Sequence, residues 1–286
     1  MRKIRKFRKI AVSFLTAVLL LTALTAAGTV IPSKKDAAED LEVHFFEAGA
    51  ADAILLTTES SAVLIDAGED GFGETILEYL GKKGIAQIDY LIITHFDQDH
   101  VGGAADVLEG ISVGTVLQSN QPKDSDEYEN YEAALNNTGI KAVTVRETYT
   151  FVLDGVSYSI DPPRQTEYDE DKSNNSSLII SVANGDNRFL FAGDAQTQRL
   201  EEFLETNSVT YDVLKMPHHG RDEPLLDALL SSVKPSLAII TSSDDEPESE
   251  AVVRSLEDLG IRVLLTREGA ITLQSDGSDI SFVSSS

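Results

Sequence analysis

The sequence contains no cysteine. The chain therefore cannot form disulfides, and an exported form would rely on its apolar core alone. The same absence excludes a lipid-modified cysteine at a signal cleavage site. Basic residues are also scarce, with 23 Lys+Arg against 48 Asp+Glu and a formal net charge of −25. Such a surface repels polyanions and argues against a basic nucleic-acid groove.

The N-terminal segment has the composition of a secretory signal. Six basic residues lie within residues 2–9, residues 10–24 are almost entirely apolar, and small residues follow to position 28. We expect residues 1–27 to be a signal peptide or, if uncleaved, a membrane anchor, residues 28–40 a linker, and residues 41–286 one large domain. The expected location is secreted, or tethered to the outer face of the cytoplasmic membrane. Cleavage would remove six of the basic residues and no acidic one, which leaves a net charge of −31.

Short runs of Val, Ile, Leu and Phe alternate with helical patterns through the rest of the chain. Each half begins with strands and continues with strands that alternate with helices. This order predicts an α/β (α+β) fold of two stacked mixed sheets with outer helices and functional groups at strand ends. Strands are expected at 42–46, 53–57, 62–66, 90–94, 113–118, 141–145, 150–153, 156–160, 178–183, 188–192, 213–216, 237–241, 263–266 and 270–274, and helices at 74–83, 101–109, 127–137, 197–205, 225–232 and 251–259.

A cluster of metal-binding side chains follows the apolar run at residues 90–94. His95, Asp97, Asp99 and His100 stand within six residues, and two glycines come after them. Imidazoles and carboxylates hold the divalent metals that activate water. A calcium loop does not fit, because its twelfth position would be Leu108. The cluster therefore favours metal-assisted hydrolysis.

Two further polar groups follow apolar strands in the second half of the chain. Asp194 comes directly after residues 188–192 and is placed to bridge two metals. His218 and His219 come after residues 213–216. Adjacent histidines point in different directions, so one can ligate a metal while the other handles a proton. His44, by contrast, lies inside a strand and is interpreted as structural.

Several motifs carry a resemblance to a known family. They are His95-x-Asp97-x-Asp99-His100-x-Gly102-Gly103, Asn174-Asn175-Ser176-Ser177-Leu178, Phe191-Ala192-Gly193-Asp194 and Leu214-Lys215-Met216-Pro217-His218-His219-Gly220. The opening strands add Val43-His44-Phe45-Phe46, Asp52-Ala53-Ile54-Leu55-Leu56 and Leu64-Ile65-Asp66-Ala67-Gly68. From about residue 41 to its end, the sequence resembles the metallo-β-lactamase superfamily of metal-dependent hydrolases. It is most similar to the hydrolase domain of the ComEC-type competence proteins and its secreted stand-alone relatives.

The resemblance implies a four-layer αββα sandwich with a site for two divalent metal ions, zinc or manganese, at one edge. By position, His95 and Asp97 would hold the first ion, with Asn175 near the place of a third histidine in many relatives. The second ion would be held by Asp99 and His100, and Asp194 would bridge the two. His218 and His219 would lie beside the metals.

Three departures from the family pattern bear on the site. The opening motif is Gly49-Ala50-Ala51-Asp52, where relatives often have Gly-Gln-Gly-Asp, and Arg221 stands where they have serine. A late histidine that serves the second metal in many relatives is replaced by Glu246. Glu246 is either a sixth metal ligand, which would shift the preference toward manganese or iron, or part of a solvated loop that weakens the second site.

The favoured function is a secreted metal-dependent hydrolase that attacks a phosphodiester with a metal-bound hydroxide. Asp99 would steer the nucleophile, and His218 or His219 would stabilise developing charge or protonate the leaving group. The alternatives are hydrolysis of a lactone, thioester or β-lactam on the same fold, and a secreted binding module with an impaired second metal site. The expected partner is a small molecule or phosphodiester. A nucleic-acid substrate stays open but is disfavoured by the acidity, and a membrane is expected only through an uncleaved N-terminus.

Overall fold

The computed structural model describes residues 40–283. The expected signal segment at 1–27 and nearly all of the expected linker lie outside the described residues. None of the described helices has the length and apolar character needed to cross a membrane.

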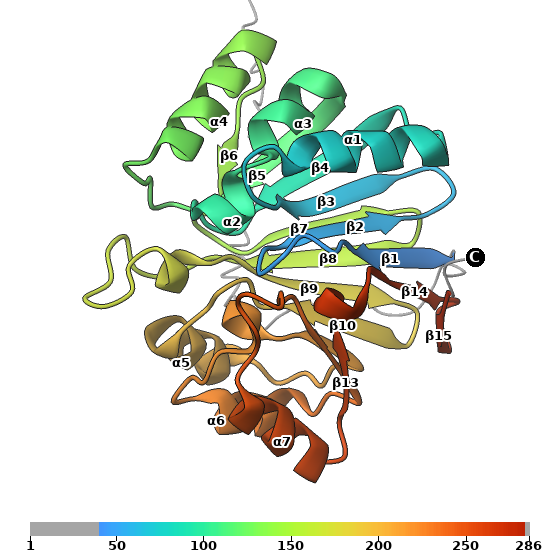
Figure 1. Ribbon diagram of the computed structural model, residues 1–286, viewed down its shortest axis with the longest axis vertical. Helices are drawn as coiled ribbons and strands as arrows, with labels where there is room; N and C mark the ends of the chain where they lie inside the picture. Colours follow the sequence, from blue (N-terminus) through green and yellow to red (C-terminus); the bar gives the residue numbers. More distant parts are fainter. Residues whose placement is uncertain (1–39, 284–286) are drawn as a thin grey trace, which may run out of the picture.

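Two sheets lie face to face at the centre of the described chain (Figure 1). The first has eight strands, in the order β15 (Ile280–Phe282), β14 (Ile271–Ser275), β1 (Leu41–Phe45), β2 (Ala53–Thr57), β3 (Ala62–Ala67), β4 (Gln87–Ile93), β5 (Ser112–Gln118) and β6 (Val143–Thr144). The second has seven, in the order β13 (Arg262–Leu265), β12 (Leu237–Ile240), β11 (Val213–Lys215), β10 (Asn187–Phe191), β9 (Ile179–Asn184), β8 (Val156–Asp161) and β7 (Tyr149–Leu153).

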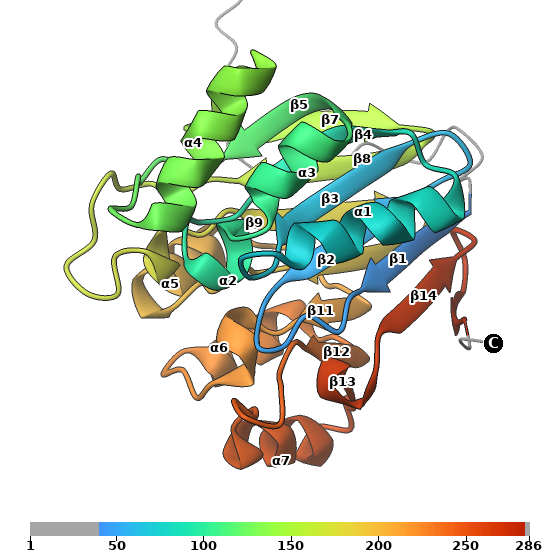
Figure 2. The ribbon, with the colours of Figure 1, turned by 45° about the horizontal axis from the view of Figure 1, so that its top comes forward.

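Helices cover the outer face of each sheet (Figures 1 and 2). The first sheet carries α1 (Phe72–Lys83), α2 (Gln98–Val101), α3 (Ala104–Gly110) and α4 (Asp126–Thr138), and the second carries α5 (Thr197–Thr206), α6 (Leu226–Val233) and α7 (Glu250–Asp258). Short 3₁₀ turns occupy Asn174–Ser176, Pro217–Gly220 and Thr266–Glu268. The four-layer αββα sandwich of two mixed sheets is therefore confirmed.

Apolar side chains fill all three spaces between the four layers. One cluster lies between the sheets, where the Phe45 and Phe191 rings face each other at 6.1 Å. A second joins the first sheet to α1, α3 and α4, and a third joins the second sheet to α5, α6 and α7. Burial of this apolar surface stabilises a chain that has no disulfide.

Most expected elements are present, with differences at their boundaries. Strand β4 begins at Gln87, three residues before the expected start, because pairing with β5 extends through polar residues. The strand expected at 141–145 shrinks to two residues, and β15 was not predicted, since its three residues lie largely exposed at a sheet edge. The helix expected at 101–109 is two helices separated at Gly102 and Gly103. A Cβ at Gly102 would lie 2.3 Å from the backbone nitrogen of Asp70, so only glycine fits this approach.

His44 lies within β1, away from the loops that follow the parallel strands, and is packed as a structural residue. Its ring stacks on Tyr79 at 4.3 Å, and its Nδ1 lies 2.7 Å from the Thr272 hydroxyl. Burial lowers the pKa of His44 from 6.5 to about 4.

The pKa of His44 predicts a pH-dependent loss of stability. Between pH 6.5 and about 4 the unfolded chain binds a proton that the folded protein does not, so His44 destabilises the fold as the pH falls. For His44→Phe, we expect the wild type to lose about 2 kcal/mol more unfolding free energy than the variant between pH 7 and pH 5. Urea denaturation at the two pH values measures this difference. Parallel pH curves for the two proteins would contradict it.

Candidate metal centre

Parallel strands from both sheets end at the same edge of the sandwich. In the first sheet β3 and β4 are parallel, and in the second β10, β11 and β12 are parallel. The loops that follow the carboxyl ends of these strands carry the polar side chains singled out in the sequence. This edge is where open α/β sheets usually place their functional sites.

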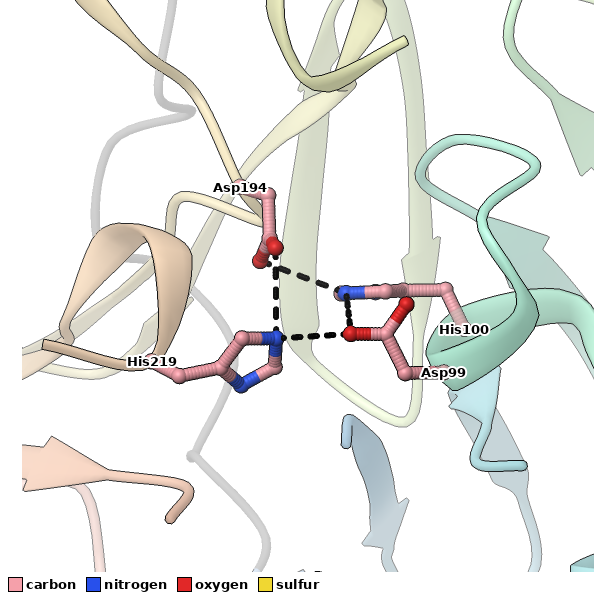
Figure 3. Close-up of side chains that lie close together, drawn as sticks. All are labelled: Asp99, His100, Asp194 and His219. Atoms are coloured by element: carbon pink, nitrogen blue, oxygen red, sulfur yellow. Dashed lines mark hydrogen bonds and ion pairs between the residues drawn. The ribbon is translucent and has the colours of Figure 1, made fainter. Parts of the chain in front are cut away.

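Four side chains from these loops converge on one buried point: Asp99, His100, Asp194 and His219 (Figure 3). The Nε2 atom of His219 lies 3.1 Å from Asp99 Oδ2 and 3.2 Å from Asp194 Oδ2. The Nε2 atom of His100 lies 3.2 Å from Asp194 Oδ1. Two carboxylates and two imidazoles, each with one ligand atom within 4.8 Å of the others, form a donor set that suits a transition metal.

The histidines of the first sheet are oriented by Asp66, which is completely buried. Its carboxylate accepts hydrogen bonds from the Thr94 amide and hydroxyl, both at 2.7 Å, and from His100 Nδ1 at 2.8 Å. Since the Thr94 hydroxyl donates to Asp66, its oxygen accepts from His95 Nδ1, 3.1 Å away. Both Nδ1 atoms therefore carry protons, and the Nε2 atoms of His95 and His100 present lone pairs.

A matching arrangement in the second sheet orients His219. The Thr241 hydroxyl donates to Asp52 Oδ1 at 2.7 Å. His219 Nδ1 lies 3.0 Å from both the hydroxyl and the carbonyl oxygen of Thr241, and donates to them. The Nε2 atom of His219 is thus aimed at the carboxylates of Asp99 and Asp194. Each sheet contributes one chain of carboxylate, threonine and histidine.

The unpartnered atoms of the cluster fit a bound cation. Among the described residues, His100 Nε2 and Asp194 Oδ1 are buried and face only each other, at 3.2 Å, without a well-formed hydrogen bond, and His95 Nε2, beside the cluster, is buried without a hydrogen-bond partner. Such atoms are costly to bury unless a ligand satisfies them. Divalent metals bind neutral imidazole nitrogen and carboxylate oxygen, which is the donor set that the network exposes here.

The pKa values show how strongly the cluster attracts positive charge. Burial alone would lower the pKa of His219, but the Asp194 carboxylate and hydrogen bonds to Asp194 and Asp99 raise it to about 9. Burial is likewise outweighed at His100, whose pKa the carboxylates of Asp194 and Asp66 raise well above its usual value. At Asp194, burial is outweighed by His219 and His100, which hold the carboxyl pKa well below its usual range. A proton or a metal cation therefore stabilises the same four groups.

Lys215 balances the negative charge behind the cluster. Its side chain is fully buried, and its ammonium donates to the Asp52 carboxylate and to the Gly193 carbonyl at 3.2 Å. The Asp194 carboxylate lies 3.6 Å from the same nitrogen. Burial would lower the pKa of Lys215, but Asp52 and Asp194 raise it. Lys215 therefore stays charged and holds Asp52 and Asp194 in place.

The backbone around His218 and His219 is strained. Both residues adopt left-handed conformations, with φ of 47° and 52°. Such conformations cost roughly 1–3 kcal/mol each in non-glycine residues and cluster at functional sites. Gly193, before Asp194, also has positive φ, at 51°, and a Cβ there would lie 3.1 Å from Ser177. These conformations send the two imidazoles in different directions, as the sequence predicts for adjacent histidines.

His218 lies outside the four-residue cluster. Its Nδ1 is 2.8 Å from Glu223 Oε1, its Nε2 is 3.4 Å from Asn174 Nδ2, and its side chain is 19 % exposed. The structure thus separates the two histidines: His219 faces the carboxylates, and His218 is anchored by Glu223 at the rim.

Three of the expected ligands, His95, Asp97 and Glu246, lie outside the cluster, as does Asn175, which stands near the place of a third histidine in many relatives. His95 Nε2 lies 3.9 Å from Asp97 Oδ2, but the other oxygen of Asp97 bonds to Lys123 and Ser173. Glu246 is exposed and pairs with Arg221 at 2.6 Å. Asn175 bonds to the Glu170 carbonyl and to the backbone of α5.

Sequence reasoning gave no role to the residues that support the site, although Asp52, Asp66 and Lys215 stand within the motifs that carry the family resemblance. The supporting residues are Asp52, Asp66, Thr94, Lys123, Lys215 and Thr241. One signal was available for Lys215, since it is a lysine within an otherwise apolar strand. Asp66 likewise stands in the apolar strand β3. The remaining contacts join residues far apart in the chain and leave no local pattern.

Comparison with known proteins agrees with this fold. The family model described as Metallo-beta-lactamase superfamily matches residues 47–241. The chain is 28 % identical over 203 residues to ComE operon protein 3 of Bacillus subtilis, covering 68 % of this chain and 25 % of that protein. It is 28 % identical over 211 residues to Recombination protein 2 of Haemophilus influenzae, covering 72 % of this chain and 25 % of that protein. Competence protein ComA of Neisseria gonorrhoeae is 26 % identical over 256 residues, covering 87 % of this chain and 34 % of that protein. The resemblance to competence-type proteins is confirmed, and the chain spans about a quarter to a third of these relatives.

Solved structures show the same fold. The metallo-β-lactamase fold protein YhfI of Bacillus subtilis has a TM-score of 0.57 at 11 % identity, covering 83 % of this chain and all of that one. CmlA, a diiron β-hydroxylase of Streptomyces venezuelae, has a TM-score of 0.53 at 17 % identity, covering 85 % of this chain and 55 % of that one.

The threonine hydroxyls that orient the histidines predict a loss of metal affinity on their removal. Thr241→Val removes one of the two acceptors of His219 Nδ1, and Thr94→Val removes the hydroxyl that donates to Asp66, the carboxylate that holds His100. Both variants keep the side-chain shape, and we expect each to weaken binding of Zn²⁺ or Mn²⁺ about 10-fold to 100-fold. Calorimetric titration of the metal measures the affinity. Thr272→Val is the matched control, because it removes a threonine–histidine bond at His44, outside the centre. Equal affinities for all four proteins would contradict the orienting role.

Proposed function

The chain belongs to the metallo-β-lactamase superfamily, and on this premise we propose that it is a metal-dependent hydrolase of phosphodiesters. Members of this fold family are typically hydrolytic metalloenzymes. The observation that carries the proposal is the buried convergence of Asp99, His100, Asp194 and His219. When bound there, a divalent cation supplies a water-derived nucleophile near neutral pH and polarises the scissile phosphoryl group.

The side chains of the cluster would have distinct roles. His100 and His219 would offer Nε2 lone pairs, and Asp194 would offer a carboxylate that Lys215 holds in position. Asp99 is the most open of the four, with its side chain 31 % exposed. Its second oxygen is therefore placed to accept a proton from an attacking water and to direct that water at the substrate.

His218 is the candidate proton donor to the leaving group. Its bond to Glu223 anchors the ring through Nδ1, and Nε2, 3.4 Å from Asn174 Nδ2, would carry the transferable proton. The side chain of His218 is partly exposed. Its backbone amide donates to the Gly193 carbonyl at 3.2 Å, which holds His218 beside the loop that carries Asp194. A histidine held by a carboxylate in this way suits general acid catalysis.

Two observations support a phosphodiester as the substrate. One relative is named for recombination and another for competence, and recombination acts on DNA, whose backbone is a phosphodiester. A cavity of about 430 Å³ is lined by Lys123 and Ser173, which contact Asp97, and by Lys172, which pairs with Glu167. Lys123 thus brings positive charge to this cavity beside Asp97. The strongly negative net charge limits affinity for long nucleic acids. We therefore propose a small or short phosphodiester substrate.

Export forms part of the same proposal. The basic, apolar and small-residue order of the first 27 residues supports secretion, or anchorage to the outer face of the cytoplasmic membrane.

Metal-dependent phosphodiester hydrolysis is tested directly with the purified protein loaded with Mn²⁺ or Zn²⁺. We expect hydrolysis of bis(p-nitrophenyl) phosphate in preference to a chromogenic lactone or cephalosporin, loss of activity with a chelator, and recovery when metal is restored. Asp194→Asn should reduce the rate to that of the metal-free protein, because it removes a central carboxylate.

Glu246→Gln is the matched control, since Glu246 is exposed and pairs only with Arg221. It should leave the rate unchanged. Chelator-resistant activity, preference for the lactone or cephalosporin, or equal losses in the two variants would each contradict the proposal.

Protonation of the leaving group by His218 predicts a dependence on leaving-group basicity. His218→Ala should slow hydrolysis of an alkyl phosphodiester about 100-fold or more, and that of the nitrophenyl ester much less, because nitrophenolate leaves without a proton. The metal content should not change. Rate constants for the two esters and metal analysis of the variant provide the test, and equal losses on both esters would exclude the acid role.

A further inference from the structure

We propose that the protein binds a single divalent cation tightly, at Asp99, His100, Asp194 and His219, and that Lys123 closes the second position at His95 and Asp97. This inference rests on the proposed metal-dependent function. It differs from the two-ion site that the family resemblance implies, because the two halves of that site are built differently in this chain.

The Asp97 carboxylate is already engaged. The Lys123 ammonium lies 2.6 Å from Asp97 Oδ1, and the Ser173 hydroxyl donates to the same oxygen. Only Oδ2 faces His95, at 3.9 Å from its Nε2. A divalent ion at this carboxylate would have to displace the ammonium or bind beside it.

The position also lacks a third protein ligand of its own. Asn175 stands near the place where a histidine would complete it, but its amide nitrogen donates to the Glu170 carbonyl at 2.9 Å. Its amide oxygen accepts from the backbone of Arg199 at 3.0 Å. Both ends of Asn175 are thus committed to the loop and to α5. Among the described residues, His95 joins no group of three or more candidate ligands.

His219 completes the other position. No histidine follows it in the sequence, and Glu246, at the place of a late histidine, lies outside the centre. The His219 Nε2 atom instead reaches within 3.1–3.2 Å of Asp99 and Asp194. The chain thus keeps a four-ligand site for one ion.

The positive charge of the Lys123 ammonium stands where a second metal cation would otherwise balance the Asp97 carboxylate. It neutralises Asp97 beside the centre, and it repels a divalent ion at the same carboxylate. Lys123 lines the cavity next to Ser173 with its side chain 37 % exposed, so a substrate anion in that cavity can reach its positive charge.

Metal binding by the full chain tests the assignment without reference to activity. We expect equilibrium dialysis against Mn²⁺ or Zn²⁺, followed by elemental analysis, to find one tightly bound ion per chain. Asp97→Asn should keep that ion, since Asp97 is not among its ligands. Lys123→Met should strengthen binding of a second ion at least about tenfold, because it leaves the Asp97 carboxylate with only the Ser173 bond and removes the repelling charge.

Lys172→Met is the matched control. Lys172 lines the same cavity but pairs with Glu167 at 2.6 Å, so its removal should leave the stoichiometry at one. Circular dichroism establishes that each variant is folded, and the wild-type stoichiometry tests the proposal without any variant.

Two tightly bound ions in the wild type, or loss of an ion in folded Asp97→Asn, would overturn this inference and leave the proposed function intact. Unchanged weak binding of a second ion in Lys123→Met would overturn the role of Lys123. A wild-type protein that binds no ion would contradict the inference and the proposed function together.

Discussion

The metal centre depends on two buried chains of hydrogen bonds that run from a carboxylate through a threonine to a histidine. Asp66 and Thr94 form one in the first sheet, and Asp52 and Thr241 form the other in the second. Each threonine hydroxyl donates to its carboxylate, so its oxygen can only accept from the imidazole. This polarity places the proton on Nδ1 and leaves Nε2 for the centre. Asp66 also accepts directly from His100 Nδ1, and the Thr241 carbonyl also accepts from His219 Nδ1, so both histidines of the centre keep one tautomer and one direction.

The buried carboxylates at this edge of the sandwich also need positive charge beside them. Asp52, Asp66 and Asp194 are all buried, and burying an ionised carboxylate is costly unless positive charge lies beside it. Lys215 supplies one such charge permanently. The remainder must come from protons on His100 and His219 or from a metal ion, as the raised pKa values of these histidines show. The folded protein is therefore stabilised when a proton or a metal cation occupies the position between these carboxylates.

Much of this arrangement could be predicted from local pattern. A polar cluster directly after an apolar strand marks a strand end, and this pattern predicted that residues 95–100, Asp194 and the His218–His219 pair lie at strand ends. That they share one edge was implied by the family resemblance. The break between α2 and α3 was missed, because helical periodicity runs through Gly102 and the close approach to Asp70 that requires glycine is a tertiary contact.

The role of Glu246 was harder to predict from the sequence. Its alignment with a histidine position suggested a ligand, whereas an ion pair with Arg221 holds it in the solvent.

The sequence by itself determined the fold class, the family and the kinds of side chain gathered at the edge, because apolar periodicity and residue chemistry are local properties. The tertiary structure alone decided which of those side chains face one another. It placed His219 among the carboxylates and His218 against Glu223, although the two are neighbours in the chain. It also brought Lys123 to Asp97 from a loop beyond the next strand. Those pairings depend on left-handed turns and on contacts across two sheets, and no spacing along the chain encodes them.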